Sequence, residues 1–171
     1  MQELHEKEQY FFTDETTGRL ADFAAHFPNP CCICAPSVGV ELGRRGVRAR
    51  VLDIDERFAA TPGFRHYDLF RPEWLGEEFG LILCDPPFFN VSLSQLFAAL
   101  RLLGRNRYEQ PLLISYLGRR SASIVGTFAR FGLTATGYSP RYKTVQALAR
   151  NEIEFFGNLS PSLHAELAQE A

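Results

Sequence analysis

Short apolar runs alternate with amphipathic segments along most of this chain, and this alternation constrains its fold more than any other feature. Residues 92–103 are the clearest helical segment, because Ser92-Leu-Ser-Gln95 forms a capping box ahead of apolar residues at helical spacing. Strands alternating with helices predict a three-layer α/β domain around a mainly parallel sheet. The predicted strands are Cys31–Ala35, Arg48–Ile54, Phe64–Tyr67, Gly80–Cys84, Leu112–Leu117, Leu133–Tyr138 and Ile153–Phe156. A further helix is predicted over Ser121–Phe131, with its apolar residues facing inward.

The two ends of the chain are expected to lie outside this alternation. Thr13 is placed to cap a helix whose apolar residues, from Leu20 to Phe27, recur at i, i+3, i+4 and i+7. A chain of 171 residues leaves little room for a second domain. We therefore expect residues 1–29 to pack on one domain formed by residues 30–158, and residues 159–171 to be a polar tail.

Composition excludes several classes of protein. With 46% apolar and 22% charged residues the chain is typical of globular proteins, and no apolar run is long enough to cross a bilayer. The N-terminal residues are polar and acidic, unlike a presequence, so we expect a soluble, cytoplasmic protein without a membrane partner. Cys31, Cys32 and Cys34, considered with His26, would not converge on one ion from a strand. We expect buried thiols and no metal site.

Charge is distributed unevenly along the chain. The formal net charge is −2, yet residues 101–150 contain eight arginines and Lys143 against one acid, Glu109, a balance of +8. This segment either binds a polyanionic partner or is a solvated surface in a chain where arginine outnumbers lysine sixteen to two. The arginines are Arg101, Arg105, Arg107, Arg119, Arg120, Arg130, Arg141 and Arg150.

The run Asp85-Pro86-Pro87-Phe88 directly follows the apolar run Gly80–Cys84. Two prolines cannot continue a sheet ladder and fix two φ angles, so they make a stiff exit at the end of the strand, where α/β sheets bind ligands. A carboxylate and a backbone carbonyl held there can accept both hydrogens of an amino group conjugated to a ring or amide, while an aromatic side chain stacks on the base. We predict that these four residues are catalytic; the alternative is a strand-terminating turn.

This motif resembles the Asp/Asn-Pro-Pro-Tyr/Phe motif of amino-group methyltransferases. From Gln9 to about Asn158, the chain resembles the family of probable N6-adenine methyltransferases, which includes ribosomal-RNA adenine and elongation-factor lysine methyltransferases. Only Asp85–Phe88 is specific by itself, and the other matches gain weight from their order and spacing. The matching segments are Gln9-Tyr-Phe-Phe-Thr-Asp-Glu-Thr16, Cys34-Ala-Pro-Ser-Val38, Leu52-Asp-Ile-Asp-Glu-Arg-Phe58, Tyr67-Asp68, Asp85–Phe88 and Asn151–Asn158.

The resemblance implies a Rossmann-like methyltransferase fold of about seven strands, the last antiparallel, with S-adenosylmethionine as cofactor. It implies that the turn Ala35-Pro36-Ser37 lies against the methionine part of the cofactor and that Asp68 lies near the adenine. Asp55, or in second place Asp53, would accept hydrogen bonds from the ribose hydroxyls. The usual glycine-rich loop after the first strand is missing apart from Gly39, which leaves open weak cofactor binding or the need for a partner protein.

The resemblance leaves the substrate open, because the family includes enzymes for nucleic-acid adenine and for protein lysine. Phe88 and the +8 segment favour adenine N6 in RNA or DNA, with Arg119 and Arg120 binding phosphate. Tyr10-Phe11-Phe12 would form a lid on a flipped base, or else a hydrophobic staple for the first helix. The alternatives are a protein lysine methyltransferase and a catalytically silent module that binds a partner through its arginines.

Overall fold

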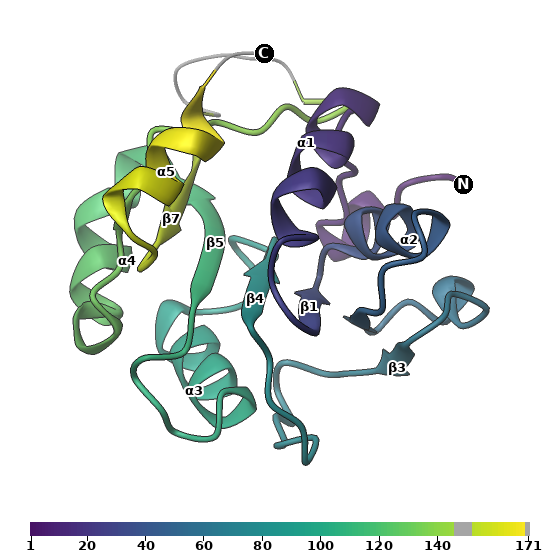
Figure 1. The fold of residues 1–171 in the computed structure, drawn as a ribbon, viewed down its shortest axis with the longest axis horizontal. Coiled ribbons are helices and arrows are strands. Elements are labelled where there is room, and N and C mark those ends of the chain that lie inside the picture. The colour runs from purple at the N-terminus through teal and green to yellow at the C-terminus, as the bar shows by residue number, and fades with distance from the viewer. Residues whose placement is uncertain (146–151, 170–171) are drawn as a thin grey trace.

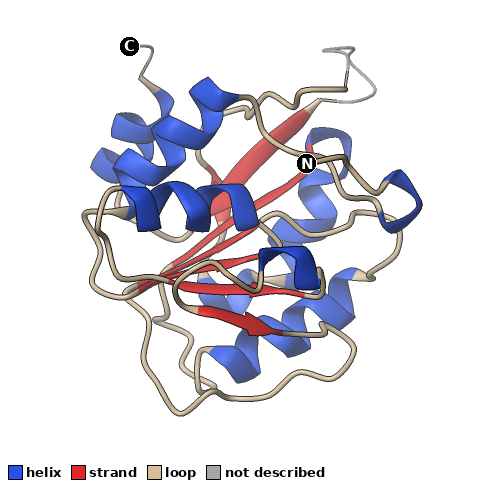
Figure 2. Ribbon diagram, turned by 90° about the vertical axis from the view of Figure 1, so that its right-hand side faces the viewer, coloured by secondary structure: helices blue, strands red, loops and turns tan. Residues whose placement is uncertain are grey.

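A single twisted sheet with helices on both of its faces forms the body of the molecule, as Figure 1 and Figure 2 show. The computed structural model describes residues 1–145 and 152–169. The strand order is β3-β2-β1-β4-β5-β7-β6, in which β7 is antiparallel to both neighbours and the other pairs are parallel. The predicted α/β fold with a mainly parallel seven-stranded sheet is confirmed. The strands are β1 (Pro30–Ile33), β2 (Arg50–Asp53), β3 (Phe64–His66), β4 (Leu81–Cys84), β5 (Leu112–Leu117), β6 (Thr134–Ala135) and β7 (Ile153–Gly157).

Short polar side chains cap the first turns of α1, α3 and α5, whereas α2 and α4 begin without a side-chain cap. Thr13 accepts a hydrogen bond from the amide of Thr16 at the start of α1, and Ser92 accepts one from the amide of Gln95 at the start of α3, so both predicted N-caps are present. The side chain of Gln95 donates to the carbonyl of Leu69 at 2.7 Å, so only half of the predicted capping box forms. The helices are α1 (Asp14–Ala24), α2 (Pro36–Arg44), α3 (Leu93–Leu103), α4 (Ser121–Thr127) and α5 (Pro161–Ala168), with 3₁₀ turns at η1 (His5–Lys7), η2 (Glu56–Phe58), η3 (Gly118–Arg120) and η4 (Ala129–Phe131).

Two predicted elements are shorter in the structure than in the sequence analysis. The single helix expected over Ser121–Phe131 divides into α4 and η4, because Phe128 leaves helical geometry (φ −98°, ψ 21°) while its side chain stays buried. The strand expected over Leu133–Tyr138 is reduced to β6, since its ladder with β7 ends at Ala135 and Gly137 turns the chain at φ 85°. Both differences come from local backbone breaks within continuous apolar patterns.

The C-terminal segment is helical where the sequence analysis places a polar tail. Ser160 caps α5 through the amide of Leu163, and Leu167 is buried. Arg19 on α1 donates to the carbonyl of Leu167 at 2.6 Å, which fastens α5 to α1. His164 and Leu167 are the buried residues of this helix and Leu163 packs partly buried against the core, so its apolar periodicity is too brief to identify it from sequence.

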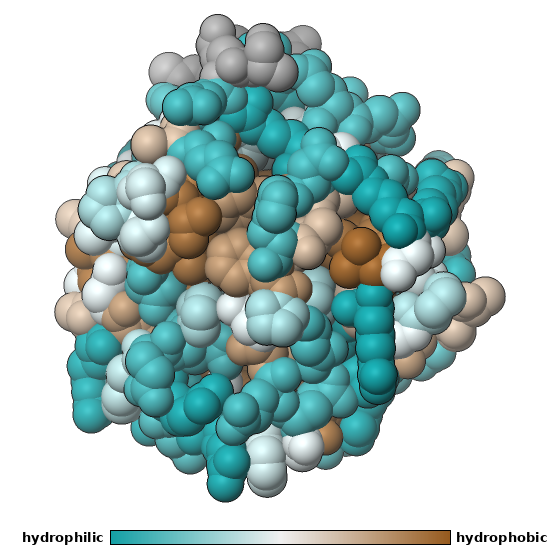
Figure 3. Space-filling view, viewed as in Figure 1, coloured by the Kyte–Doolittle hydropathy of each residue, from teal (hydrophilic) through white to brown (hydrophobic). Residues whose placement is uncertain are grey.

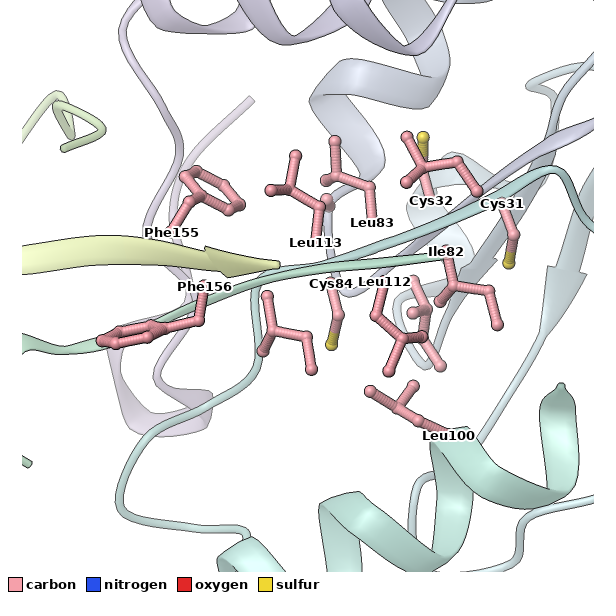
Figure 4. Close-up of a cluster of buried hydrophobic side chains, with 14 of the residues drawn as sticks. Cys31, Cys32, Ile82, Leu83, Cys84, Leu100, Leu112, Leu113, Phe155 and Phe156 are labelled. Atoms are coloured by element: carbon pink, nitrogen blue, oxygen red, sulfur yellow. The ribbon is translucent and has the colours of Figure 1, made fainter. Parts of the chain in front are cut away.

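The core lies on both faces of the central strands, where buried side chains of β1, β4, β5 and β7 meet those of the covering helices (Figure 4). Cys31, Cys32 and Cys84 are fully buried there as free thiols. Burial raises the pKa of the Cys32 thiol to about 12, so it stays protonated at neutral pH. The face drawn in Figure 3 is mainly hydrophilic with smaller apolar patches, as expected when helices turn their apolar sides toward the sheet.

Two findings hold for residues 1–145 and 152–169 taken together. No group of three histidine, cysteine, aspartate or glutamate side chains among them is arranged to hold a metal ion. None of their helices is long and apolar enough to cross a bilayer. Asn151, the first residue of the last matching segment, and Arg150 of the arginine-rich segment lie outside residues 1–145 and 152–169.

Candidate active site

A cavity of about 340 Å³ lies at the carboxyl ends of the parallel strands, the edge at which α/β sheets bind ligands. The N-terminal segment, residues 6–12, forms one of its walls. The remaining lining follows successive strands: residues 34–37 after β1, 53–55 at the end of β2, 67–70 after β3, and Asp85, Pro87, Asn90 and Val91 after β4. The cavity therefore brings the predicted cofactor residues and the Asp85–Phe88 motif to one place.

The turn after β1 is built without glycine. Cys34 adopts a left-handed conformation (φ 57°), Ala35 is the N-cap of α2, and Pro36 is the first residue of that helix. Gly39 has a packing role one turn further on, because a Cβ there would lie 2.4 Å from Cγ2 of Val51. Gly39 thus lets α2 approach β2 closely, while Ala35, Pro36 and Ser37 line the cavity.

Two carboxyl groups at the end of β2 differ in their surroundings. Asp53 is 8% exposed and accepts a hydrogen bond from the amide of Asp55 at 2.8 Å. Burial raises the pKa of Asp53 to about 6. Asp55 accepts from the side chains of Arg57 and Gln9, each at 2.8 Å, and the Arg57 guanidinium lowers the pKa of Asp55 to about 2. Asp55 is therefore a paired anion, whereas Asp53 has fewer partners.

The end of β3 contributes a polar group and an apolar rim. Asp68 lines the cavity and accepts a hydrogen bond from the amide of Phe70 at 2.9 Å. Phe70 is 59% exposed and Ile54 is 51% exposed, although both line the same cavity. Large apolar side chains left open beside a carboxylate are suited to an aromatic ring that carries hydrogen-bonding groups.

Asp85 directly follows β4, and its carboxyl accepts hydrogen bonds from two hydroxyl groups. Its Oδ1 accepts hydrogen bonds from Ser115 Oγ at 2.5 Å and from Tyr142 OH at 2.6 Å. Burial raises the pKa of Asp85 to about 7, against the lowering effect of these two hydrogen bonds. Pro86 is buried and Pro87 lines the cavity. The carboxyl of Asp85 can therefore take up or release a proton near neutral pH.

Phe88 stands beside the cavity rather than among its lining residues. Its ring meets that of Tyr116 edge-on, with centroids 5.7 Å apart and an interplanar angle of 89°. Arg120 donates to the hydroxyl of Tyr116 at 2.7 Å and lies 5.4 Å from the centre of its ring. The neighbouring Phe89 is 71% exposed, and its amide donates to the carboxylate of Glu8 at 3.0 Å. The motif thus has an aromatic and cationic wall on one side and the N-terminal segment on the other.

The three aromatic residues of the N-terminal segment all line the cavity but differ in burial. Tyr10 stacks on the His5 ring at 4.8 Å, and Phe11 meets Phe58 edge-on at 6.1 Å. Phe12 is only 2% exposed, because it packs in the core. Phe12 is therefore a core residue bordering the cavity, whereas Tyr10 and Phe11 are partly exposed.

The +8 segment does not form one surface. Arg105 and Arg107 precede β5 and pair with Glu78 at 3.5 Å and 3.6 Å, at the end of the strand remote from the cavity. Arg119 and Arg120 follow β5 in η3, on the cavity side, and both are exposed. Because β5 runs between these two pairs of arginines, they lie at opposite ends of the strand. Only part of the positive charge of the segment therefore lies near the motif.

Several residues of the site were missed by the sequence analysis. Ser115 had a usable signal, since it interrupts the apolar strand Leu112–Leu117 with a hydroxyl. Arg57 also had one, since it stands two residues after Asp55, within hydrogen-bonding reach of that carboxylate. Tyr142 and Glu8 had none, because their contacts join segments distant in sequence.

The sequence profile of the family described as probable N6-adenine methyltransferase matches residues 3–161 of this chain. A search of curated protein sequences finds no match. Among solved structures, magnesium protoporphyrin IX methyltransferase (ChlM) from Synechocystis PCC 6803 with bound SAM has a TM-score of 0.57 at 14% identity, over 84% of this chain and 77% of that one.

Two further structures show the same fold. A TehB-like SAM-dependent methyltransferase from Corynebacterium glutamicum has a TM-score of 0.56 at 16% identity, over 83% of this chain and 86% of the other. The N-methyltransferase NodS from Bradyrhizobium japonicum WM9 has a TM-score of 0.52 at 14% identity, over 85% and 96%. Fold and site together define a Rossmann-like methyltransferase. Within that class, the chain belongs to the probable N6-adenine methyltransferase family, which confirms the resemblance drawn from its motifs.

Proposed function

We propose that this protein transfers a methyl group from S-adenosylmethionine to an amino group, with N6 of adenine in RNA or DNA as the target. One observation carries the proposal. A single cavity is lined by the carboxyl groups at the end of β2, by Asp68 after β3, and by Asp85 of the Asp85–Phe88 motif. Family membership supports the chemistry, and the bound SAM of the Synechocystis structure supports the choice of cofactor.

The residues of the cavity suit this cofactor, which is a sulfonium cation with an ammonium group, a ribose and an adenine. The carboxyl groups that line the cavity favour the cation, and Ile54 and Phe70 offer apolar surface to the adenine ring. When bound, S-adenosylmethionine supplies an electrophilic methyl group. Ala35, Pro36 and Ser37 would hold its methionine part, and Asp68 would lie near its adenine.

For the ribose hydroxyls, we propose Asp53 as the main acceptor, although the sequence analysis prefers Asp55. The carboxylate of Asp55 already accepts hydrogen bonds from the Arg57 guanidinium, the Arg57 amide and Gln9. A carboxylate has about four acceptor positions, so little capacity is left there. Asp53 borders the same cavity with fewer hydrogen bonds.

On the target side, Asp85 and a backbone carbonyl would accept the two hydrogens of the amino group and aim its lone pair. The carbonyl of Pro87 already accepts from the amide of Val91 at 3.3 Å, which favours the carbonyl of Pro86. Phe88 offers a flat face for the base, and Asp85 can take the proton that the nitrogen releases, because its pKa is about 7. Arg119 and Arg120, exposed after β5, would bind phosphate.

A lysine side chain of a protein is the second candidate target. The observation that favours it is the acidic character of the N-terminal segment, in which Glu6 and Glu8 line the cavity. These carboxylates would attract an ammonium group and repel phosphate.

The test is methyl transfer from tritium-labelled S-adenosylmethionine to total RNA, genomic DNA and a protein extract, each stripped of existing methylation where possible. We expect label in nucleic acid that digests to N6-methylated adenine nucleoside. Asp85→Ala should lose this activity while still binding the cofactor, and Glu109→Ala, at an exposed acid remote from the cavity, should keep it. Label in methyllysine would favour the second candidate, and full activity in Asp85→Ala would refute the catalytic assignment.

A further inference from the structure

We infer that Ser115 and Tyr142 are positioning residues, which hold one oxygen of Asp85 so that its other oxygen faces the target amino group. This inference rests on the proposed function, in which Asp85 is the catalytic carboxyl. Both hydroxyls donate to the same atom, Oδ1, at 2.5 Å and 2.6 Å. Two donors on one oxygen fix the rotation of the carboxyl and leave Oδ2 to the substrate.

Ser115 reaches Asp85 because of the register between neighbouring strands. β4 and β5 pair in parallel with Cys84 opposite Ile114, so Asp85 and Ser115 each follow one position later. Ser115 is fully buried, and its side chain has both the carboxyl of Asp85 and the carbonyl of Cys84 within reach. A hydroxyl in the middle of an apolar strand is costly to bury unless it is hydrogen-bonded, and here its partner is the catalytic carboxyl.

Tyr142 reaches Asp85 from the segment after β6, which is attached to the N-terminal segment. An isolated antiparallel bridge pairs Phe12 with Tyr142, and the amides of Thr13 and Lys143 donate to Arg141 and Phe11, both at 2.9 Å. The Phe12 and Tyr142 rings pack with centroids 5.0 Å apart. Phe12 therefore serves the site by holding Tyr142 in place, in addition to filling the core.

The two hydroxyls also govern the charge of Asp85. Burial raises its pKa, and the hydrogen bonds from Ser115 and Tyr142 lower it again. The titratable groups that face it are Tyr142 and, from the turn after β1, Cys34; the pKa of each lies well above its ordinary value, mainly through burial for Tyr142 and through Cys84 and burial for Cys34. Both are thus neutral at pH 7, so Asp85 is the group in this cluster whose charge changes near neutrality.

The pKa of Asp85 can be measured without substrate, by following its ¹³C-labelled carboxyl by NMR during a pH titration, with Asp85→Asn providing the assignment. Tyr142→Phe removes one hydrogen bond to the ionised carboxyl, so the pKa of Asp85 should rise by about one unit. Ser115→Ala should raise it similarly and serves as the second test if Tyr142→Phe folds poorly. Tyr138→Phe is the matched control, because Tyr138 lies in the same segment but stacks on Phe155 instead.

The same variants then enter single-turnover methylation of total RNA and DNA at pH 6 to 9. For Tyr142→Phe we expect the rate profile to move up with the carboxyl pKa, so that the rate at pH 6 falls about tenfold while cofactor affinity is unchanged. An unshifted carboxyl pKa, or a shifted pKa with a wild-type rate profile, would overturn the positioning role. If Asp85→Ala itself is fully active, the proposed function fails instead, so the two failures are distinguishable.

Discussion

Replacing Asp85 with asparagine should stabilise the fold above neutral pH while removing activity. The carboxyl of Asp85 ionises with a pKa of about 7 in the folded protein, against an ordinary value of 3.8. Because the folded protein holds this proton more tightly than the unfolded chain, ionisation of Asp85 opposes folding. Asparagine cannot ionise, and its amide oxygen can still accept hydrogen bonds from Ser115 and Tyr142.

The expected gain in unfolding free energy follows from the size of the pKa shift of Asp85. The contribution of Asp85 to stability is fully present below pH 4. It is lost as the pH rises from about 4 through 7, at about 1.4 kcal/mol for each pH unit. A shift of roughly three units corresponds to about 4 kcal/mol, and partial exposure of the side chain reduces this to about 2–4 kcal/mol. The variant should therefore match wild type near pH 4 and exceed it by that amount at pH 8.

Urea unfolding of both proteins at pH 4, 5, 6, 7 and 8 measures this difference directly. The pKa shifts of Asp53 and Asp55 are present in both proteins and cancel. Asp22→Asn, which removes an exposed carboxylate paired with Arg45 on the protein surface, is the matched control for the loss of one negative charge. Parallel curves for wild type and Asp85→Asn between pH 4 and 8 would refute the reasoning, because they would show that ionising Asp85 costs the fold nothing.

Three further predictions concern binding and turnover. Asp53→Asn should weaken S-adenosylmethionine affinity in calorimetry more than Asp55→Asn does, since Asp53 has free acceptor capacity; the reverse order would restore Asp55 as the ribose ligand. Replacing Arg119 and Arg120 with alanine should lower nucleic-acid affinity and make it less steeply dependent on salt, and an unchanged salt slope would contradict phosphate binding at η3. Phe88→Ala should weaken substrate binding about five- to a hundredfold and Phe88→Tyr much less, because base–aromatic stacking is worth roughly 1–3 kcal/mol; equal single-turnover constants for all three proteins would contradict stacking.

The sequence predicted the fold well because its signals were local and repeated. Apolar runs, caps at Thr13 and Ser92, and the proline pair after β4 each act within a few residues. Where the prediction was wrong, the apolar pattern was either interrupted by a backbone break, as at Phe128, or too short to detect, as in α5.

The site was predicted only in part, and there is a physical reason why some of its features could be predicted and others could not. Strand ends can be read from sequence, so Asp53, Asp55, Asp68 and Asp85 were all expected at one edge of the sheet, and the structure places them around one cavity. What binds each carboxyl could not be read, because such partners come from other segments. The hydrogen bond from Gln9 to Asp55 is an example, and together with the nearby Arg57 it leaves Asp53 with more free acceptor capacity than Asp55.

The N-terminal segment contacts both sides of the proposed site. Gln9 donates to Asp55 on the cofactor side, and Glu8 accepts from the amide of Phe89 at the exit of the motif. Phe12 packs against Tyr142, which in turn holds Asp85. A displacement of this segment would therefore open the cavity and loosen the contacts that hold Asp85, because Glu8, Gln9 and Phe12 all belong to it.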